Sequence, residues 1–242
     1  MARPLAIDLF CGLGGWTDGM LAEGWRVIGY DIEAHEYGEQ RYKGEFVRQD
    51  VLAIHGSQFK DAALIVASPP CQEYSYMAMP WTLAKAKAAA IRADTTGAEL
   101  ERLNRLFNAS FRIQKEASIA AGRHIPLIVE NVRGAIPWVG RSRYNFGSFH
   151  LWGDVPALMP FGRHAKVPRF RFDGSGKSFQ TASVGGVKNG NDWFGSGANC
   201  SLQRRAGSAS KARKAASAMI AKIPEPLSRH IGRTFLPQSI AA

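Results

Sequence analysis

The sequence is poor in cysteine, in acidic side chains and in long apolar runs, and each shortage excludes a class of protein. Its 242 residues include three cysteines, Cys11, Cys71 and Cys200. Such a small, odd number provides no disulfide framework and is typical of a reducing compartment. No apolar run reaches the roughly 20 residues that a transmembrane helix needs. Because a strand-like pattern starts within the first residues, we expect no signal peptide, and hence a cytoplasmic protein with no membrane partner.

Acidic residues are outnumbered by basic ones, 20 against 31, which leaves a formal net charge of +11. Lysine and arginine bind polyanions by displacing the counterions condensed on phosphates, so the excess favours a nucleic acid as partner. The alternative is that the charge only keeps the protein in solution. One basic stretch could contact phosphates or could be a solvated helix face: Arg204, Arg205, Lys211, Arg213 and Lys214.

Short apolar runs that end in turns alternate with segments of helical spacing. The runs predict buried strands at residues 5–10, 25–30, 62–67 and 124–129, with a further strand-like segment at 144–152. The helical spacing predicts helices at residues 15–23, 34–42, 98–121, 210–222 and 227–235. Such alternation implies crossover helices, and therefore an α/β fold with a doubly wound, mostly parallel sheet.

Composition divides the chain into three parts. Residues 1–152 carry the alternating pattern and, with 45% of the whole chain hydrophobic, can bury one sizeable core. Residues 153–210 are rich in glycine and proline and predict a small separate region or an ordered set of loops. Residues 211–242 predict C-terminal helices that pack back on the first part. Within the first part, residues 76–97 predict a long loop with some helix, a kind of segment that is often functional.

Glycines and acids follow the first strands in an order that suits a nucleoside. Gly12 and Gly14 come directly after the first predicted strand, where they let the backbone approach a ligand closely. Asp31 ends the second strand, where an acid can accept hydrogen bonds from ribose hydroxyls, and Asp50 could meet an adenine amino group. Each acid alone could equally be a capping or surface residue. Together they predict a nucleoside pocket.

A thiol and a carboxyl group follow two later apolar runs. Cys71 stands after Pro69 and Pro70, a position unsuited to the core, where free cysteines usually lie. A thiolate there can attack an electrophilic carbon if neighbouring groups lower its pKa. Glu130 ends another run and could protonate or hydrogen-bond a heterocycle nitrogen, although alone it could be a surface carboxylate. Asn131 is expected to hold the turn beside it.

Three short motifs in combination resemble the cytosine-5 DNA methyltransferase family. They are Phe-x-Gly-x-Gly at residues 10–14, Pro-Cys-Gln at 70–72 and Glu-Asn-Val at 130–132, in the family's order and approximate spacing. The resemblance covers residues 5 to about 150. It implies a class I, Rossmann-like methyltransferase domain that binds S-adenosylmethionine and releases S-adenosylhomocysteine without a metal. It further implies a target-recognition region at 153–210 and double-stranded DNA as the partner of a monomer.

The resemblance also implies roles for residues of this chain. Cys71 matches the nucleophile that adds to C6 of a flipped-out cytosine, and Glu130 matches the acid that contacts N3 and the exocyclic amine. Arg143 is the nearest candidate for the arginine that contacts the cytosine carbonyl. The segment 76–97 matches the mobile loop that closes on the substrate. The expected cofactor-binding residues are Phe10, Gly12, Leu13, Gly14, Asp31, Ile32, Asp50, Val51, Pro70 and Leu106.

The chain departs from the family in two places. Arg141-Ser-Arg143 is all that corresponds to the family's Gln-x-Arg-x-Arg element, and the Gly-Asn pair expected near residues 220–223 is missing. The chain is also short for the family, and in this respect it resembles the family's compact versions from bacteriophages and prophages. That resemblance suggests the cytoplasm of a bacterium or of a phage-infected cell, and leaves open a role in restriction-modification or in regulation.

Three other functions stay open at this point. The same cysteine chemistry could act on RNA. A methyltransferase acting on an amino group would fit Ser68-Pro69-Pro70, but Cys71 stands where that class carries an aromatic residue. A nucleic-acid-binding protein that kept the fold and lost turnover would fit the altered C-terminal element, although it would not need Cys71 and Glu130.

Overall fold

The computed structural model of the protein describes residues 2–75, 81–160 and 210–237, which belong to two compact units. The described part of the first unit comprises residues 2–34, 42–75, 81–160 and 223–237. It holds all the strands discussed below. The described part of the second unit comprises residues 35–41 and 210–222, and its helix is α7 (Lys211–Ala221).

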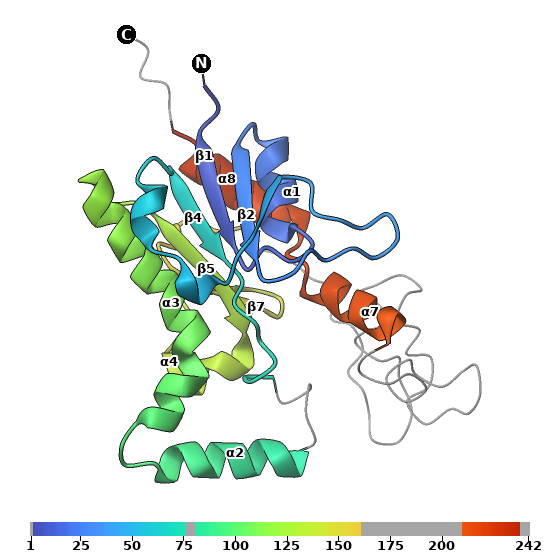
Figure 1. Cartoon of the computed structure of the whole chain (residues 1–242), viewed down its shortest axis with the longest axis vertical. Helices are drawn as coiled ribbons and strands as arrows, with labels where there is room; N and C mark the ends of the chain where they lie inside the picture. Colours follow the sequence, from blue (N-terminus) through green and yellow to red (C-terminus); the bar gives the residue numbers. More distant parts are fainter. Residues whose placement is uncertain (1, 76–80, 161–209, 238–242) are drawn as a thin grey trace. The chain divides into compact units, whose positions relative to one another are not determined.

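The described residues of the first unit form a seven-stranded sheet in the order β3-β2-β1-β4-β5-β7-β6 (Figure 1). Strands β1 to β5 are parallel, whereas β7 is antiparallel to β5 and β6 is antiparallel to β7. The α/β fold with a doubly wound, mostly parallel sheet is therefore confirmed. The strands are β1 (Leu5–Leu9), β2 (Arg26–Asp31), β3 (Glu45–Arg48), β4 (Leu64–Ala67), β5 (Leu127–Val132), β6 (Tyr144–Phe146) and β7 (Phe149–Gly153).

Neighbouring strands β1 and β4 mark the point where the strand order reverses. The chain adds β2 and β3 on one side of β1, and then returns to place β4 and β5 on the other side. Leu9 pairs with Tyr30 on one side and with Ala67 on the other, and Ala67 pairs with Val129. The turns that follow these strands thus emerge along one edge of the sheet. Ligands of doubly wound folds bind at such a switch point, outside the carboxyl ends of the strands.

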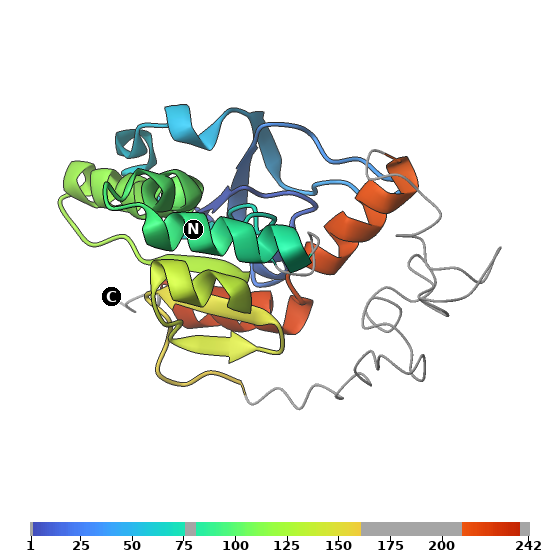
Figure 2. The same ribbon diagram turned by 90° about the horizontal axis from the view of Figure 1, so that it is seen from below.

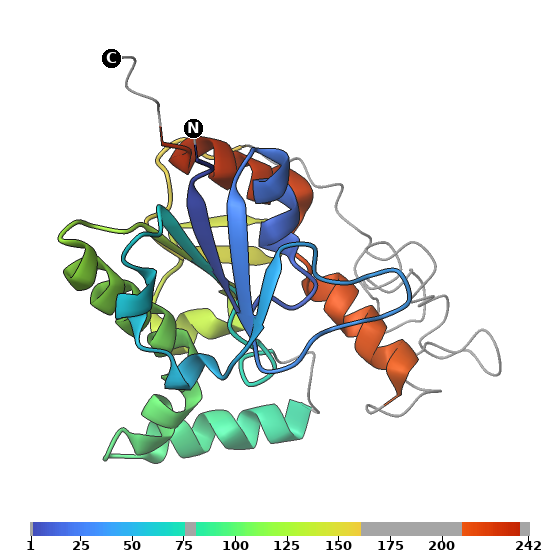
Figure 3. The same ribbon diagram turned by 45° about the horizontal axis from the view of Figure 1, so that its top comes forward.

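One face of the sheet is covered by helices α1 (Gly15–Ala22) and α8 (Glu225–Phe235), which lie side by side in Figures 1 and 3. Leu227 and Ile231 of α8 are buried in the hydrophobic cluster on this face. A side chain at Gly19 would collide with Ser228, so glycine allows the two helices to approach closely. Glu23, directly after α1, forms ion pairs with Arg229 (2.6 Å) and Arg233 (2.7 Å) of α8.

The other face is covered by α3 (Ala98–Ala121), which follows the predicted bounds of 98–121 (Figure 2). Its side chains Leu103, Phe107, Ile113 and Ala117 repeat at helical spacing and are buried against the sheet. Figure 2 also shows the β6–β7 hairpin, in yellow, at the edge of the sheet. The N-terminal end of α3 adjoins α2 (Trp81–Ala93), and the short helix α4 (Ile136–Val139) packs beside α3.

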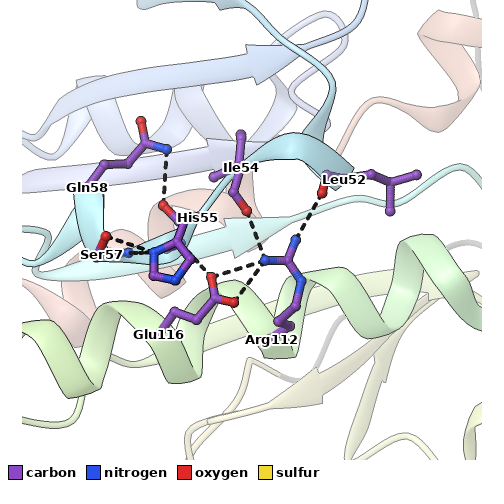
Figure 4. Close-up of polar contacts among 8 residues, drawn as sticks. Leu52, Ile54, His55, Ser57, Gln58, Arg112 and Glu116 are labelled. Atoms are coloured by element: carbon purple, nitrogen blue, oxygen red, sulfur yellow. Dashed lines mark hydrogen bonds and ion pairs between the residues drawn. The ribbon is translucent and has the colours of Figure 1, made fainter.

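A polar cluster fastens two short 3-10 helices, η1 (Val51–Ala53) and η2 (Gly56–Phe59), to α3 (Figure 4). Arg112 donates hydrogen bonds to the carbonyls of Ile54 (2.9 Å) and Leu52 (3.3 Å). Glu116 accepts one from the backbone N–H of Gly56 (2.6 Å) and pairs with Arg112 (3.0 Å). These contacts hold η1 and η2, the segment that follows Asp50, against α3. They therefore fix the chain on one side of the edge at which the carboxyl ends of the strands meet.

Two sequence predictions need correction. The helix predicted at residues 34–42 is wrong: this segment contains an isolated antiparallel bridge between Tyr37 and Gln40, with Gly38 at a φ of 63°. A left-handed glycine in its centre ends any helix there. The strand predicted at 124–129 begins instead at Leu127, directly after Pro126, which has no N–H to donate to a ladder. Within the described part of the chain, no helix combines the length and apolar character that a membrane crossing requires.

Candidate active site

Two turns meet at the switch point, and we call them the first turn (residues 10–14, after β1) and the second turn (residues 68–74, after β4). The backbone N–H of Ser68 donates to the carbonyl of Leu9 (3.1 Å), so the two turns start from adjacent, bonded positions. The indole Nε1 of Trp16, early in α1, donates to the hydroxyl of Ser68 (3.0 Å). These two hydrogen bonds connect the first and second turns within the protein itself, without a ligand.

The first turn is wound in left-handed backbone conformations. Phe10 has a φ of 57°, an uncommon value for a residue with a side chain, and Gly12 and Gly14 have φ of 49° and 73°. Strain of this kind costs about 1–3 kcal/mol and persists at sites where the surroundings impose it. Asp31 imposes it in part, because its carboxylate accepts from the backbone N–H of Gly12 (2.9 Å); it also accepts from the backbone N–H of Ile32 (2.8 Å), the next residue.

A buried polar network lies beneath the first turn. Thr17 donates to the carboxyl group of Asp8 (2.7 Å) and is also hydrogen-bonded to the hydroxyl of Tyr42 (2.7 Å). Asp8 is 1% exposed. Burial, countered in part by the Thr17 hydrogen bond, raises the pKa of Asp8 to about 8. Burial, with Asp8 and Asp31 nearby, also raises the pKa of the Cys11 thiol.

The expected cofactor-binding residues differ in their exposure and in their contacts. Ile32 exposes 65% of its surface directly after Asp31, and so offers an apolar face where a heterocycle could lie. Asp50 caps η1 by accepting from Leu52 N (2.9 Å). Of the remaining ones, Leu13 and Val51 are buried, Leu106 is half-buried on α3 and Pro70 is exposed. An exposed apolar side chain beside a positioned carboxylate and a glycine turn suits an adenosine group.

The second turn presents Cys71, which is partly exposed. The Cys71 carbonyl accepts from the backbone N–H groups of Tyr74 (3.0 Å) and Ser75 (2.9 Å), which closes the turn. Asn131, at the end of β5, donates to the carbonyl of Pro69 (2.9 Å), as expected of a residue that holds this turn. Since Asn131 is adjacent to Glu130, this bond brings the carboxyl-bearing end of β5 against the thiol-bearing turn.

Glu130 is buried beside Cys71. It is 8% exposed, and it follows Val129, the strand partner of Ala67, so that it lies next to Ser68 at the end of β4. Burial raises the pKa of Glu130 to about 8, and the Ser68 hydrogen bond opposes that rise. Burial, with the nearby Glu130, also raises the pKa of the Cys71 thiol to about 11. At neutral pH the site therefore holds a neutral acid and a neutral thiol side by side.

Comparison with known proteins agrees with these motifs. The model of the family described as C-5 cytosine-specific DNA methylase matches residues 5–135, more than half of the chain. The chain belongs to this family. Cys71 and Glu130 both lie inside the matched range, as do both turns.

Individual relatives of this methylase-family chain match it over limited lengths. Type II methylase M.HgiDII of Herpetosiphon aurantiacus is 32% identical over 78 residues, 28% of this chain and 22% of that protein. A structure from E. coli described as a DNA modification methyltransferase encoded within a prophage has 22% identity and a TM-score of 0.36, covering 55% of this chain and 33% of that one. The Dnmt2 methyltransferase of S. pombe has 14% identity and a TM-score of 0.35, covering 57% and 37%. This chain thus spans less than two fifths of each.

Arg143, expected beside the cytosine, lies directly before β6 in this methylase-family structure. Its backbone N–H donates to Leu151 O (2.9 Å), and its side chain lines a cavity of about 330 Å³ with Trp152 and Asp154. That cavity also contacts Leu127, and Leu151, to which Arg143 is bonded, pairs with Glu130 across β5 and β7. Cys71 and Glu130 interact electrostatically at the switch point, and the role expected of Arg143 stays a prediction.

Two residues at the site were missed by sequence reasoning: Ser68, directly after β4, and Trp16, which donates a hydrogen bond to Ser68. Asp8 was also given no role. The available signals were a polar serine that ends an apolar run and a lone acid inside the first strand. Among the described residues, no group of three His, Cys, Asp or Glu side chains could hold a metal ion. Cys200, Arg204 and Arg205 lie outside the described residues.

Proposed function

We propose that the protein is an S-adenosylmethionine-dependent DNA cytosine-5 methyltransferase, with Cys71 as nucleophile and Glu130 as acid. The observation that carries this proposal is the pairing of a partly exposed thiol with a buried, protonated carboxyl group at the switch point. Family membership supports the reaction class. A binding protein without turnover would not need a reachable thiol next to a carboxyl group with a raised pKa.

The raised pKa values set the order of the chemistry. Glu130, with a pKa of about 8, is mostly protonated at neutral pH and can donate a hydrogen bond to N3 of cytosine. As the Cys71 sulfur bonds to C6, its proton leaves to solvent and the electrons of the C5–C6 double bond move towards N3. The proton of Glu130 is transferred to N3 and neutralises the charge that develops there.

The second half of the reaction reverses these changes. S-adenosylmethionine, when bound, supplies the methyl group that C5 accepts. A base then removes the C5 proton, the bond between sulfur and C6 breaks, and the N3 proton returns to Glu130. The cytosine must leave the helical stack first, at a cost of a few kcal/mol, because Cys71 could not otherwise reach C6.

The remaining roles in this proposal follow from position. Phe10, Gly12 and Gly14 would hold the methionine and adenosine of the cofactor, Asp31 the ribose, and Asp50 the adenine, with Ile32 against the ring. Residues 153–210 would recognise the DNA target; of these, 161–209 lie outside the described residues. The partner would be double-stranded DNA, bound by a monomer in the cytoplasm, and the +11 charge supports a polyanion.

Covalent trapping tests the proposal directly. Duplex oligonucleotides with 5-fluorocytosine in many sequence contexts are incubated with the protein and S-adenosylmethionine. Because fluorine at C5 cannot be removed as a proton can, the adduct with Cys71 should persist and migrate as a crosslinked species on a denaturing gel. C71A should form none. Crosslinking to 5-fluorocytosine in transfer RNA but not in DNA would replace the DNA assignment with an RNA one, and no crosslink to either would end the proposal.

A further inference from the structure

One arginine of α3 holds two backbone carbonyls of the segment that follows Asp50 (Figure 4). Arg112 donates from Nη2 to the carbonyl of Leu52 (3.3 Å) and from Nη1 to the carbonyl of Ile54 (2.9 Å). The N–H donors of a guanidinium group lie in one rigid plane, so that a single side chain can bridge two acceptors at fixed positions. Arg112 therefore fixes the path of the chain between Leu52 and Ile54.

Glu116, one turn further along α3, holds a third backbone group of the same segment. Its carboxylate accepts from the backbone N–H of Gly56 (2.6 Å) and pairs with Arg112 (3.0 Å). A side chain at Gly56 would meet the carbonyl of Ile113 at 2.0 Å, so glycine lets the segment lie directly against the backbone of α3. The segment is thus held at three successive alternate positions, 52, 54 and 56, by a single turn of one helix.

The orientation of the Asp50 carboxylate depends on this segment. Its Oδ1 accepts from the backbone N–H of Leu52 (2.9 Å), the residue whose carbonyl accepts from Arg112. Leu52 therefore connects the two side chains through its own peptide groups. Val51 and Ile54, on either side of it, are 2% and 1% exposed, so the segment is also anchored in the core. Asp50 itself is exposed, and its Oδ2 hydrogen-bonds to no group in the part of the chain that the structure describes. One oxygen orients the carboxylate, and the other can accept from a ligand.

We propose that Arg112 and Glu116 are positioning residues for the adenine end of the cofactor pocket, which aim the Asp50 carboxylate at the 6-amino group of adenine. This inference rests on the proposed function, in which Asp50 contacts the adenine. Adenine carries N–H donors at position 6, whereas hypoxanthine carries a carbonyl oxygen there. A carboxylate held in place accepts from the first base and repels the second. The Arg112–Glu116 pair therefore determines which base the pocket selects.

The test measures the choice between two ligands by calorimetry, with S-adenosylhomocysteine and its inosine analogue, S-inosylhomocysteine. The wild type should prefer the adenosine ligand by roughly ten- to a hundredfold, the size expected for a hydrogen bond to a charged group. R112K keeps the charge and loses the planar donor fork, so it should lower this preference by roughly threefold or more. E116Q should lower it by less, because its amide oxygen can still accept from Gly56.

The matched control is R102K, which changes an exposed ion pair with Glu99 on the same helix and should leave the preference unaltered. If Arg112 only stabilised the fold, R112K would weaken the binding of both ligands by the same factor. An unchanged ratio of the two affinities in R112K would therefore overturn the inference, whatever happened to the affinities themselves.

A second measurement needs no ligand. Hydrogen exchange of the Leu52 amide, which donates to Asp50, is followed by NMR in the unliganded, full-length protein. This amide should exchange roughly tenfold faster in R112K than in the wild type or R102K, because the segment opens locally once Arg112 no longer bridges it. Equal exchange in all three proteins would overturn the inference. A protein that shows the adenosine preference but never crosslinks to 5-fluorocytosine would reject the proposed reaction and keep the role of Arg112 and Glu116.

Discussion

The two turns at the switch point each contain a cysteine with a buried carboxyl group nearby. In the first turn the pair is Cys11 and Asp8, and in the second it is Cys71 and Glu130. Both carboxyl groups have a pKa raised to about 8 by burial. The pKa of each thiol is raised as well. By electrostatics alone, neither cysteine is activated, although burial raises the pKa of Cys11 further than that of Cys71.

Access separates the two pairs. Cys11 is 5% exposed and its Sγ lies against Gly29, where even one added methyl group would collide with it. Asp8 is bonded to Thr17 beneath the turn. Cys71, in contrast, is partly exposed at the end of a turn held by Asn131. The comparison teaches that reactivity at this site depends on which thiol a substrate can reach, and that the thiol must lose its proton during attack.

Exchanging either cysteine for alanine gives the largest expected difference between the turns. C71A should lower the rate of methyl transfer by more than about 10⁴-fold, because no other group at the second turn can form the bond to C6. Binding of S-adenosylmethionine, measured by calorimetry, should remain nearly intact. C11A should still crosslink to 5-fluorocytosine DNA, with a loss of stability of about 1 kcal/mol. Turnover by C71A, or loss of the crosslink in a folded C11A, would reverse the comparison.

The two carboxyl groups give the next largest difference. E130Q should slow methyl transfer by roughly 10²–10⁴-fold, since glutamine cannot give a proton to N3. D8N, at saturating cofactor, should slow it by less than about tenfold, because Asp8 lies under the first turn and away from the thiol of the second. Single-turnover rates for both variants decide the matter. Equal losses of rate in E130Q and D8N would show that burial of the carboxyl group, rather than its contact with the cytosine, governs the rate of methyl transfer.

The extent to which these turns were predictable from the sequence differs by residue. Gly12, Cys71 and Glu130 stand in local motifs whose chemistry is readable from neighbouring residues, and the structure brings the last two together. The bond between Trp16 and Ser68 joins residues 52 positions apart, and no local pattern encodes such a contact.

The segment at 34–42 shows a second limit. Its spacing suits a helix, but Gly38 adopts a left-handed conformation, and spacing alone does not reveal which glycine will do so. Tyr42, at its end, instead bonds to Thr17 beneath the first turn. Helix α3, whose apolar repeat is long and regular, was predicted with its observed bounds.

The carboxylate that supports the first turn gives a smaller effect, confined to cofactor binding. D31N should weaken binding of S-adenosylmethionine by roughly ten- to a hundredfold, as expected for hydrogen bonds to a charged acceptor. The bond from Gly12 N shapes the first turn, and a second bond, from Ile32 N, is local to the end of β2. Calorimetry with the exposed variant D61N as a matched control measures the change. An unaltered affinity in D31N would remove Asp31 from the cofactor site and leave it only a structural role.

The smallest effect concerns stability and its dependence on pH. Folded protein keeps the protons of Asp8 and Glu130 up to about pH 8, whereas the unfolded chain releases them near pH 4. Between those values the folded state binds more protons, so its stability should fall as the pH rises and level off above about pH 8. Near pH 5 the Asp8 carboxyl group of the folded wild type is protonated and uncharged, as asparagine always is. The stability of D8N should therefore differ little from that of the wild type at this pH.

Near pH 9 the wild-type protein carries a buried charge at position 8 that D8N lacks. D8N should therefore unfold a few degrees higher than the wild type at this pH, measured by calorimetric melting of the unliganded proteins. D61N, which loses an exposed carboxylate, should show no such crossover between the two pH values. If D8N were less stable than the wild type by the same margin at both, the Asp8 carboxyl group would be contributing through its hydrogen bond to Thr17, and its burial would not explain the pH dependence.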